Sequence, residues 1–359
     1  MRRERSAAFA PGRVNLIGEH TDYNGGLALP FAIAQGVTVR ARALAAQEPA
    51  RIEAHAVDLG ERDVFLLSDS SPASGWRAFV RGTVGELLRS GQPLAGAALE
   101  IHGEVPRGAG LSSSAALSVA LCLALIELAA TEQGGELERA GTSATDRLAI
   151  ARLCSRVEND WVGAHTGLLD QLACLFGAPD QAVCIDFATL EIEPVPLSLG
   201  RWRLFVLDSK EAHTHAGSGY NERRAECARA CELLGVGSLS EADVGDLGGL
   251  PEPLRLRARH VLGENERVRE AVAALLAGEL AALGALLNAS HESQRDLFEV
   301  STPAIEAVVE RVRRAGAAGA RMIGGGFGGS VLGLFPPGVD PPPTALEVHP
   351  SAGAHVLDG

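Results

Sequence analysis

Lysine is almost absent from this sequence. Lys210 is the only lysine among 359 residues, and no glycine-rich run precedes it. The chain therefore lacks the Walker A loop of the P-loop nucleotidases, whose lysine holds nucleotide phosphates. It also lacks the strand lysine that protein kinases require. If this chain transfers phosphoryl groups, it does so without a lysine of either kind.

Negative charge exceeds positive charge in this sequence, and aromatic residues are scarce. The formal net charge is -13, which argues against nucleic acid as a partner because phosphate backbones are bound by basic faces. A small anionic ligand is still compatible with an acidic chain, because backbone amides at a helix N-terminus can hold it. Aromatics make up 4% of the residues, so Leu, Val and Ala must fill most of the core. The length predicts two domains or one large one.

Cysteine motifs and long apolar runs are missing as well. The six cysteines are scattered, and none forms a Cys-x-x-Cys pair. Neither a zinc site nor a disulfide framework is therefore predicted. We expect a protein with reduced cysteines in the cytoplasm. No apolar segment follows the basic start MRRERS, so no secretory signal is predicted. The apolar stretch 115–126 has 12 residues. A membrane span needs about 20, so we expect a buried helix and no membrane.

The hydrophobic pattern predicts a mixture of strands and helices. Strands are expected within 9–40, on either side of a turn at 22–26, and at 98–105, 203–208 and 330–335. Helices are expected at 113–130, 146–160, 168–176, 219–234, 264–288 and 303–320. A second domain should begin near residue 180. The proline-rich stretch 336–343 should be an exposed turn without a packed helix.

A segment rich in glycine and serine, Pro106–Ala116 (PRGAGLSSSAA), lies between a strand pattern and a helix pattern. Small residues let the backbone approach a phosphate closely, and the helix N-terminus presents free N–H groups and a partial positive charge. Ser112, Ser113 and Ser114 add hydroxyl groups that can bind a phosphate or a metal ion. The alternative is an ordinary helix N-cap, for which serine is also favoured.

A second glycine cluster, Gly324–Gly329 (GGGFGG), formally fits the G-x-G-x-x-G pattern of dinucleotide-binding proteins. That pattern requires a strand before it and a helix after it. Here a helix pattern precedes the cluster and a strand pattern follows it. We therefore expect a tight backbone turn near a ligand, and no dinucleotide site.

The segment Gly12–Gly26 (GRVNLIGEHTDYNGG) places Arg13, Asn15, Glu19, His20, Asp22 and Tyr23 within eleven residues. Carboxylates beside a histidine and an arginine suit a ligand with many hydroxyl groups, such as a sugar, because each hydroxyl needs donors and acceptors. The alternative is a polar turn with a surface ion pair. His20 lacks the spacing of a metal site, and a solvated loop is expected for Glu211, His213 and His215.

Together these three motifs resemble the GHMP kinases. The segments 106–116 and 321–330 resemble the second and third motifs of that family, and 12–26 resembles the first motif of its galactokinase branch, which N-acetylgalactosamine kinases share. The resemblance runs from about Ala8 to Leu334. It implies an α+β, two-domain GHMP kinase fold, with an N-terminal mixed-sheet domain at 1–178 and a C-terminal α/β domain at 179–359. The active site would lie in the cleft between them.

The resemblance also implies a role for each residue that matches a family motif. Asp170 would be the catalytic base that accepts the proton of a C1 hydroxyl, and Arg13 would stabilise it and the transferring phosphoryl group. The sugar would be bound by Glu19, His20, Thr21, Asp22, Gly167, Asp170 and Tyr220. ATP would be bound by Gly108, Ala109, Gly110, Leu111, Ser112, Ser113, Ser114 and Trp76, with Phe79 near the adenine. Ser114 and Glu158 would bind Mg²⁺, which prefers oxygen ligands.

The activity implied by the resemblance is ATP-dependent phosphorylation of galactose to galactose 1-phosphate, in a monomer with galactose and ATP as its small-molecule partners. One alternative is an N-acetylgalactosamine kinase, which needs room at C2 of the sugar. The other is a non-catalytic regulator that binds galactose and ATP, against which the presence of Asp170, Arg13, Ser114 and Glu158 argues. Asp170 has its own alternative, as the N-cap of the helix it opens. After Leu334 the chain departs from the family, because a proline-rich stretch replaces a helix.

Overall fold

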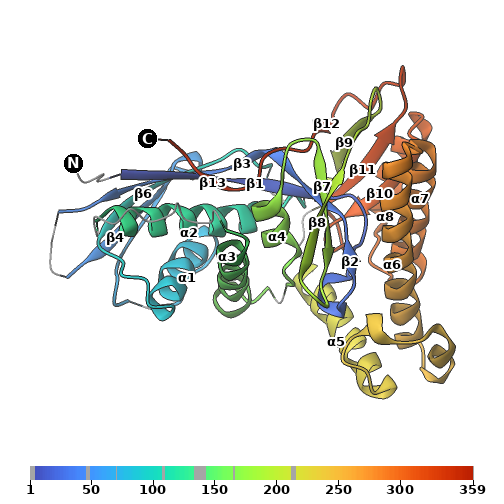
Figure 1. Ribbon diagram of the computed structural model, residues 1–359, viewed down its shortest axis with the longest axis horizontal. Coiled ribbons are helices and arrows are strands. Elements are labelled where there is room, and N and C mark those ends of the chain that lie inside the picture. Colours follow the sequence, from blue (N-terminus) through green and yellow to red (C-terminus); the bar gives the residue numbers. More distant parts are fainter. Residues whose placement is uncertain are drawn as a thin grey trace.

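The computed structural model describes residues 5–45, 49–69, 71–106, 110–132, 143–164, 166–211 and 216–358 (Figure 1). Within these ranges the chain forms three β-sheets, of six, four and three strands. Helices α1 to α4 gather at one end of the molecule and α5 to α8 at the other (Figure 1). The candidate site lies where the two ends meet.

The six-stranded sheet has the order β13-β1-β3-β6-β4-β5. Its strands are β1 Arg5–Asn15, β3 Pro30–Ala43, β4 Arg51–Ala56, β5 Glu61–Leu66, β6 Ala97–Gly103 and β13 His355–Val356. The β4–β6 pair is parallel and the other pairs are antiparallel, so the sheet is mixed, as the family resemblance implies. β13 comes from the end of the chain. We therefore propose that the chain divides into two domains near residue 178. The last strand of the C-terminal half, β13, then returns to the sheet of the N-terminal domain, where it pairs with β1.

Four helices pack with this sheet: α1 Trp76–Arg89, α2 Ser113–Glu132, α3 Ala144–Arg156 and α4 Leu169–Phe176. α2 lies against β1 and β3, and α1 and α3 pack against α2 (Figure 1). Among the described residues, Ser113–Ala130 is the one stretch long and apolar enough to cross a membrane, but 72% of it is buried inside the protein. α2 is therefore the core helix predicted from the apolar stretch.

The four-stranded sheet has the order β10-β11-β9-β12, and the three-stranded sheet the order β2-β7-β8. The strands are β2 Leu27–Ala28, β7 Gln181–Asp186, β8 Glu191–Pro196, β9 Arg203–Asp208, β10 Gly319–Ile323, β11 Ser330–Phe335 and β12 Leu346–Val348. The helices are α5 Ala216–Leu234, α6 Leu254–Ala277, α7 Leu280–Asp296 and α8 Pro303–Arg314. α6 packs between α5 and α7, and α7 and α8 cover β10.

Several predicted boundaries are wrong, each for a local reason. The single helix expected at 264–288 is two helices, because Gly278 adopts a left-handed conformation (φ 71°) and ends α6. The helix expected at 146–160 continues past Arg156 as a π-helical turn. The stretch 336–343 contains no helix, as predicted, although Val339 packs against the core and its carbonyl accepts a hydrogen bond from Arg203 (3.0 Å).

A bulge in β1 brings the first sequence motif against the second. The register between β1 and β3 shifts between Pro11 and Arg13. A Cβ atom on Gly12 would lie 2.6 Å from the carbonyl oxygen of Leu111, so only glycine permits this approach. The Arg13 N–H donates to the same carbonyl at 3.1 Å. The strand that carries Arg13 is thus fixed to the loop before α2.

Candidate active site

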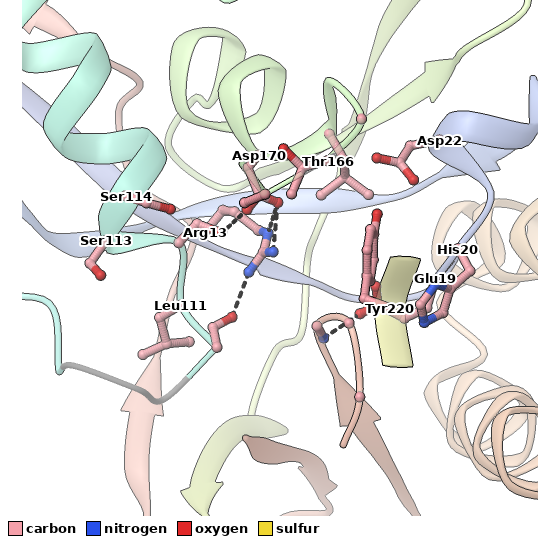
Figure 2. A pocket seen from close by; sticks show the side chains of 18 of the residues that line it. Arg13, Glu19, His20, Asp22, Leu111, Ser113, Ser114, Thr166, Asp170 and Tyr220 are labelled. Atoms are coloured by element: carbon pink, nitrogen blue, oxygen red, sulfur yellow. Dashed lines mark hydrogen bonds and ion pairs between the residues drawn. The ribbon is translucent and has the colours of Figure 1, made fainter. Parts of the chain in front are cut away.

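A cavity of about 350 Å³, which we call the acidic cavity, opens where the three motifs meet (Figure 2). The first motif contributes four charged or polar side chains, and the second and third motifs contribute mainly backbone and hydroxyl groups. Its principal lining residues are Arg13, Glu19, His20, Asp22, Gly110, Leu111, Ser112, Ser113, Ser114, Thr166, Gly167, Asp170, Tyr220, Gly324, Gly325 and Gly326. Most of the site residues implied by the resemblance are therefore brought together.

Arg13 and Asp170 form an ion pair at the centre of this cavity (Figure 2). Arg13 donates from Nε and Nη2 to Oδ1 of Asp170, at 2.8 and 2.6 Å. Its Nη1 donates to the carbonyl of Gly110 at 2.6 Å. The hydroxyl of Ser112 donates to the other oxygen of Asp170, Oδ2. One carboxylate thus joins β1, the loop before α2, and α4.

The interpretation of Asp170 as an ordinary helix cap is wrong. The N-cap of α4 is Leu168, and no side chain caps this helix. Asp170 lies in the first turn, and its carboxylate contacts Arg13 and Ser112 instead of the free N–H groups of the helix. The side chain is therefore directed into the cavity.

Glu158 lies in the π-helical turn Val157–Val162 and is 3% exposed. Its Oε2 accepts hydrogen bonds from the hydroxyl of Thr166 (2.7 Å) and the amide of Gln171 (2.9 Å). Its Oε1 is buried and has no hydrogen-bond partner among the described residues. Burial and the negative charge of Asp170 raise the pKa of Glu158, while the hydroxyls of Thr166 and Ser114 lower it.

This donor set fits Mg²⁺. An unpartnered, buried carboxylate oxygen is unfavourable, and a cation would stabilise it. Ser114 supplies a hydroxyl oxygen beside Glu158. Over the described part of the chain, no group of three or more His, Cys, Asp or Glu residues could hold a metal. One carboxylate and one hydroxyl suit Mg²⁺, which typically keeps several waters and completes its shell with substrate phosphates.

Asp22 faces Asp170 across the cavity from the turn after β1 (Figure 2). Burial, and then the negative charge of Asp170, raise the pKa of Asp22 to about 6. A Cβ atom on Gly167 would lie 1.9 Å from Oδ2 of Asp22, so the absence of a side chain at 167 leaves room for the carboxylate. Gly167 therefore shapes the cavity and contributes no side chain to it.

Glu19 and His20 line the side of the cavity beside Tyr220 (Figure 2). Oε1 of Glu19 accepts a hydrogen bond from the N–H of Gly324 (2.8 Å), which joins the first motif to the third. Burial raises the pKa of Glu19, and the charge of Arg321 opposes this. Burial lowers the pKa of His20, so this ring is neutral at pH 7. Its Nε2 is buried, and no residue in the described part of the chain forms a hydrogen bond with it.

Some implied residues are placed elsewhere. Thr21 is buried and does not line the cavity, because its hydroxyl lies within hydrogen-bonding distance of the carbonyls of Gly18 (3.0 Å) and Leu27 (2.8 Å). Gly108 and Ala109 lie outside the described residues, as do His213 and His215. The sequence did not identify Thr166, Gln171 or Arg321 as residues of the site. Thr166 and Gln171 contact Glu158, and Arg321 contacts Glu19, but nothing in their spacing along the chain indicates these contacts.

Trp76 lines a second cavity, of about 430 Å³, which we call the α1 cavity. Trp76 and Phe79 extend from α1 into it, and Leu59, Ile101 and Leu117 add apolar surface. Ser113 and Ser114 line both cavities. The two cavities therefore meet at the N-terminus of α2, where free N–H groups favour an anion.

Three family models match the sequence. They are the galactokinase galactose-binding signature at residues 2–43, the N-terminal domain of GHMP kinases at 78–178 and the C-terminal domain of GHMP kinases at 271–348. A galactokinase from Mycobacterium tuberculosis is 44% identical over 335 residues, which cover 91% of this chain and 88% of that protein. The chain belongs to the galactokinase family. A galactokinase from Streptomyces coelicolor is 38% identical, over 97% of this chain and 93% of its own length.

Solved structures agree with this assignment. The structure of Lactococcus lactis galactokinase complexed with galactose superposes with a TM-score of 0.87 at 32% identity, covering 99% of this chain and 96% of that one. A mevalonate kinase superposes with a TM-score of 0.66 at 17% identity, covering 96% and 98% of the two chains, and so shares the fold alone. The two-domain GHMP kinase fold implied by the three motifs is therefore confirmed.

The first prediction concerns Glu158. Replacing it by Ala removes the unpartnered carboxylate oxygen, so half-maximal activity should require at least about tenfold more Mg²⁺, as is typical when groups that support a metal site are lost. Ser114→Ala should have a smaller effect, because water can replace one hydroxyl ligand. A Mg²⁺ titration of each variant measures this, with circular dichroism as the control for folding. Identical titration curves for Glu158→Ala and the wild type would contradict the assignment of both ligands.

The second prediction concerns Asp22 and pH. Its pKa is raised from 3.8 to about 6, so the carboxylate gains a proton as the pH falls through about 6, and one of its oxygens then no longer accepts a hydrogen bond from a sugar hydroxyl. The kcat/KM for the sugar, which reports the free enzyme, should therefore fall as the pH is lowered from 7 to 5. Asp22→Asn, which is neutral throughout, should be less active at pH 7 and lack this decline. An equally steep decline in Asp22→Asn would show that another group titrates.

Proposed function

We propose that this enzyme transfers the γ-phosphoryl group of ATP to the C1 hydroxyl of galactose, which yields galactose 1-phosphate and ADP. The observation that carries the proposal is the position of Asp170. Its carboxylate is held by Arg13 between the hydroxyl-rich N-terminus of α2 and the polar residues Glu19, His20 and Asp22. Membership of the galactokinase family supports galactose as the sugar.

The two oxygens of Asp170 have different roles in this proposal. Oδ1 receives two N–H groups of Arg13 and stays an acceptor of that ion pair. Oδ2 contacts only the Ser112 hydroxyl among the hydrogen bonds of the described residues, so it is the oxygen that takes the proton from the sugar. The deprotonated C1 oxygen forms a bond to the γ-phosphorus as the bond from that phosphorus to the ADP oxygen breaks. Arg13 stabilises the charge that develops on the phosphoryl group.

The nucleotide would occupy the α1 cavity and the mouth of the acidic cavity. The indole ring of Trp76 and the ring of Phe79 suit a flat adenine, because aromatic and apolar surfaces stack on a purine. The phosphates would then lie at Ser113 and Ser114, where the cavities meet and the N-terminus of α2 stabilises negative charge. Phosphoryl transfer needs mainly positioning and charge stabilisation, so no lysine is required.

Ser114 and Glu158 would hold Mg²⁺ beside these phosphates. When bound, the ion neutralises charge on the phosphate oxygens and orients the transferring group. Thr166 and Gln171 hold the other oxygen of Glu158, and so they orient its free oxygen. The cytoplasm as the compartment of the enzyme and the monomer as its oligomeric state remain predictions.

Two alternative functions can be distinguished from this proposal by experiment. An N-acetylgalactosamine kinase would use the same residues with more room at C2. A regulator would bind galactose and ATP without turnover. In this chain Arg13, Asp170 and Ser114 line the acidic cavity, and Glu158 lies beside Ser114. That intact arrangement favours the enzyme.

A coupled assay of ADP release, run side by side with galactose, N-acetylgalactosamine, glucose and mevalonate, tests the proposal. Galactose should be turned over best, and glucose slower by up to about 10⁴-fold, because polar groups that pair with an axial C4 hydroxyl are left unpaired by the equatorial epimer. Fast turnover of N-acetylgalactosamine would favour the first alternative. Binding of galactose without ADP release would favour the second.

A further inference from the structure

The turn that carries Glu19 is held from behind by α6, a helix whose role the sequence motifs do not reveal. Glu264 of α6 is fully buried and does not line either cavity. Its Oε1 accepts hydrogen bonds from the backbone N–H groups of Gly18 (3.0 Å) and Glu19 (3.4 Å). The same oxygen accepts a hydrogen bond from the hydroxyl of Ser290 in α7 (2.6 Å). A side chain of the C-terminal part thus holds the backbone of the first motif.

His260, one turn earlier in α6, holds the carbonyl of the same turn. Its Nε2 lies 3.1 Å from the Glu19 carbonyl and its Nδ1 lies 2.8 Å from the hydroxyl of Ser293. Burial lowers the pKa of His260 to about 4, so the ring is neutral at pH 7 and carries one N–H. A carbonyl can only accept, so this N–H is on Nε2 and Nδ1 accepts from Ser293. Both polar backbone groups of Glu19 are therefore bonded to α6.

The turn requires such support because its backbone is strained. Gly18 has φ 98° and His20, a residue with a side chain, has φ 62°. Left-handed conformations are unfavourable for residues other than glycine and persist where the surroundings impose them. The bonds from α6 add to those that Asn15 and Asn24 make with the carbonyls of Gly18 and His20, and they alone hold both polar backbone groups of Glu19.

Glu264 is suited to this task because it is charged. Burial, the largest single influence, would by itself raise the pKa of Glu264, but the surrounding positive charges together outweigh it, the first of them that of Arg267, whose Nε donates to Oε2 at 2.7 Å. The pKa is lowered to about 2, so the carboxylate is ionised at pH 7. Hydrogen bonds from N–H groups to a carboxylate are stronger than those to a neutral oxygen.

We propose that Glu264 and His260 are positioning residues for sugar recognition, which act by fixing the backbone of Gly18–His20. This inference rests on the proposed function, in which the turn binds galactose. It assigns to α6 a share in sugar affinity and none in nucleotide binding, because α6 contributes no residue to the α1 cavity.

The test is Glu264→Gln, which keeps the size and one acceptor oxygen but removes the charge. The KM for galactose and the Kd for galactose measured by calorimetry should both rise about fivefold, since hydrogen bonds to a charged group are worth about 1 kcal/mol more than neutral ones. The KM for ATP should stay within about twofold. A second variant, His260→Gln, should raise the same two constants.

The matched control is Glu86→Gln in α1. Glu86 is another buried carboxylate paired with arginine (Arg156 Nε, 2.7 Å), but α1 lies at the opposite end of the molecule from α6 (Figure 1). The Glu86→Gln substitution should lower the melting temperature of the protein without changing the KM or the Kd for galactose. Unchanged galactose constants in Glu264→Gln, or equal increases for galactose and ATP, would overturn the positioning role. Wild-type enzyme that binds galactose and releases no ADP would contradict the proposed function instead, and calorimetry would still report the role of Glu264.

Discussion

The ion pair between Arg13 and Asp170 is the contact on which the arrangement of the site depends. These residues are 157 positions apart in the sequence, and their side chains are 8% and 24% exposed. Arg13 binds at once to Asp170, to the carbonyl of Gly110 and, through its own N–H, to that of Leu111. Losing it would leave a half-buried carboxylate unpaired and release the loop before α2. The strand β1, this loop and the helix α4 are therefore positioned by one side chain.

Crowding of negative charge is the second constraint on this site. The charge of Asp170 raises the pKa of both Asp22 and Glu158. Lysine is absent from the described lining of both cavities, and Arg13 is the arginine that lines the acidic one. Substrates that carry phosphate would add to this repulsion. In the proposed function, the N-terminus of α2 and a bound Mg²⁺ would offset this repulsion, and the ion would bind the buried oxygen of Glu158 that has no donor among the described residues.

Features of the fold and the site that depend on neighbouring residues could be predicted from the sequence, whereas those that depend on contacts between distant segments could not. The segment 106–116 carries its own signals, small residues and serines before an apolar run, so the loop and the start of α2 were predicted from local chemistry. The end of α6 had a local signal too, Gly278, which the continuing helical period obscured. Asp170 was assigned by family resemblance, and its contacts removed the alternative of a cap.

Other features depend on contacts that no local pattern encodes. Thr21 lies in the motif between two cavity residues, yet its hydroxyl turns back to the carbonyls of Gly18 and Leu27. Glu264 appears in the sequence as one more carboxylate on a helix with many charges, and its partner Gly18 is 246 residues away. Periodicity predicts which face of a helix is buried, but it does not predict which backbone a buried carboxylate will meet.

The most direct test of the account is the rate of phosphoryl transfer in Asp170→Asn. This change keeps the size of the side chain and removes both its charge and its capacity to take a proton. Single-turnover measurements with saturating ATP and galactose should show a rate about 10²–10⁴-fold below that of the wild type, as is typical when a positioned base is lost. Circular dichroism and calorimetry should show a folded variant that still binds galactose and ATP. A folded variant that transfers the phosphoryl group at close to the wild-type rate would contradict the role of Asp170 as the base.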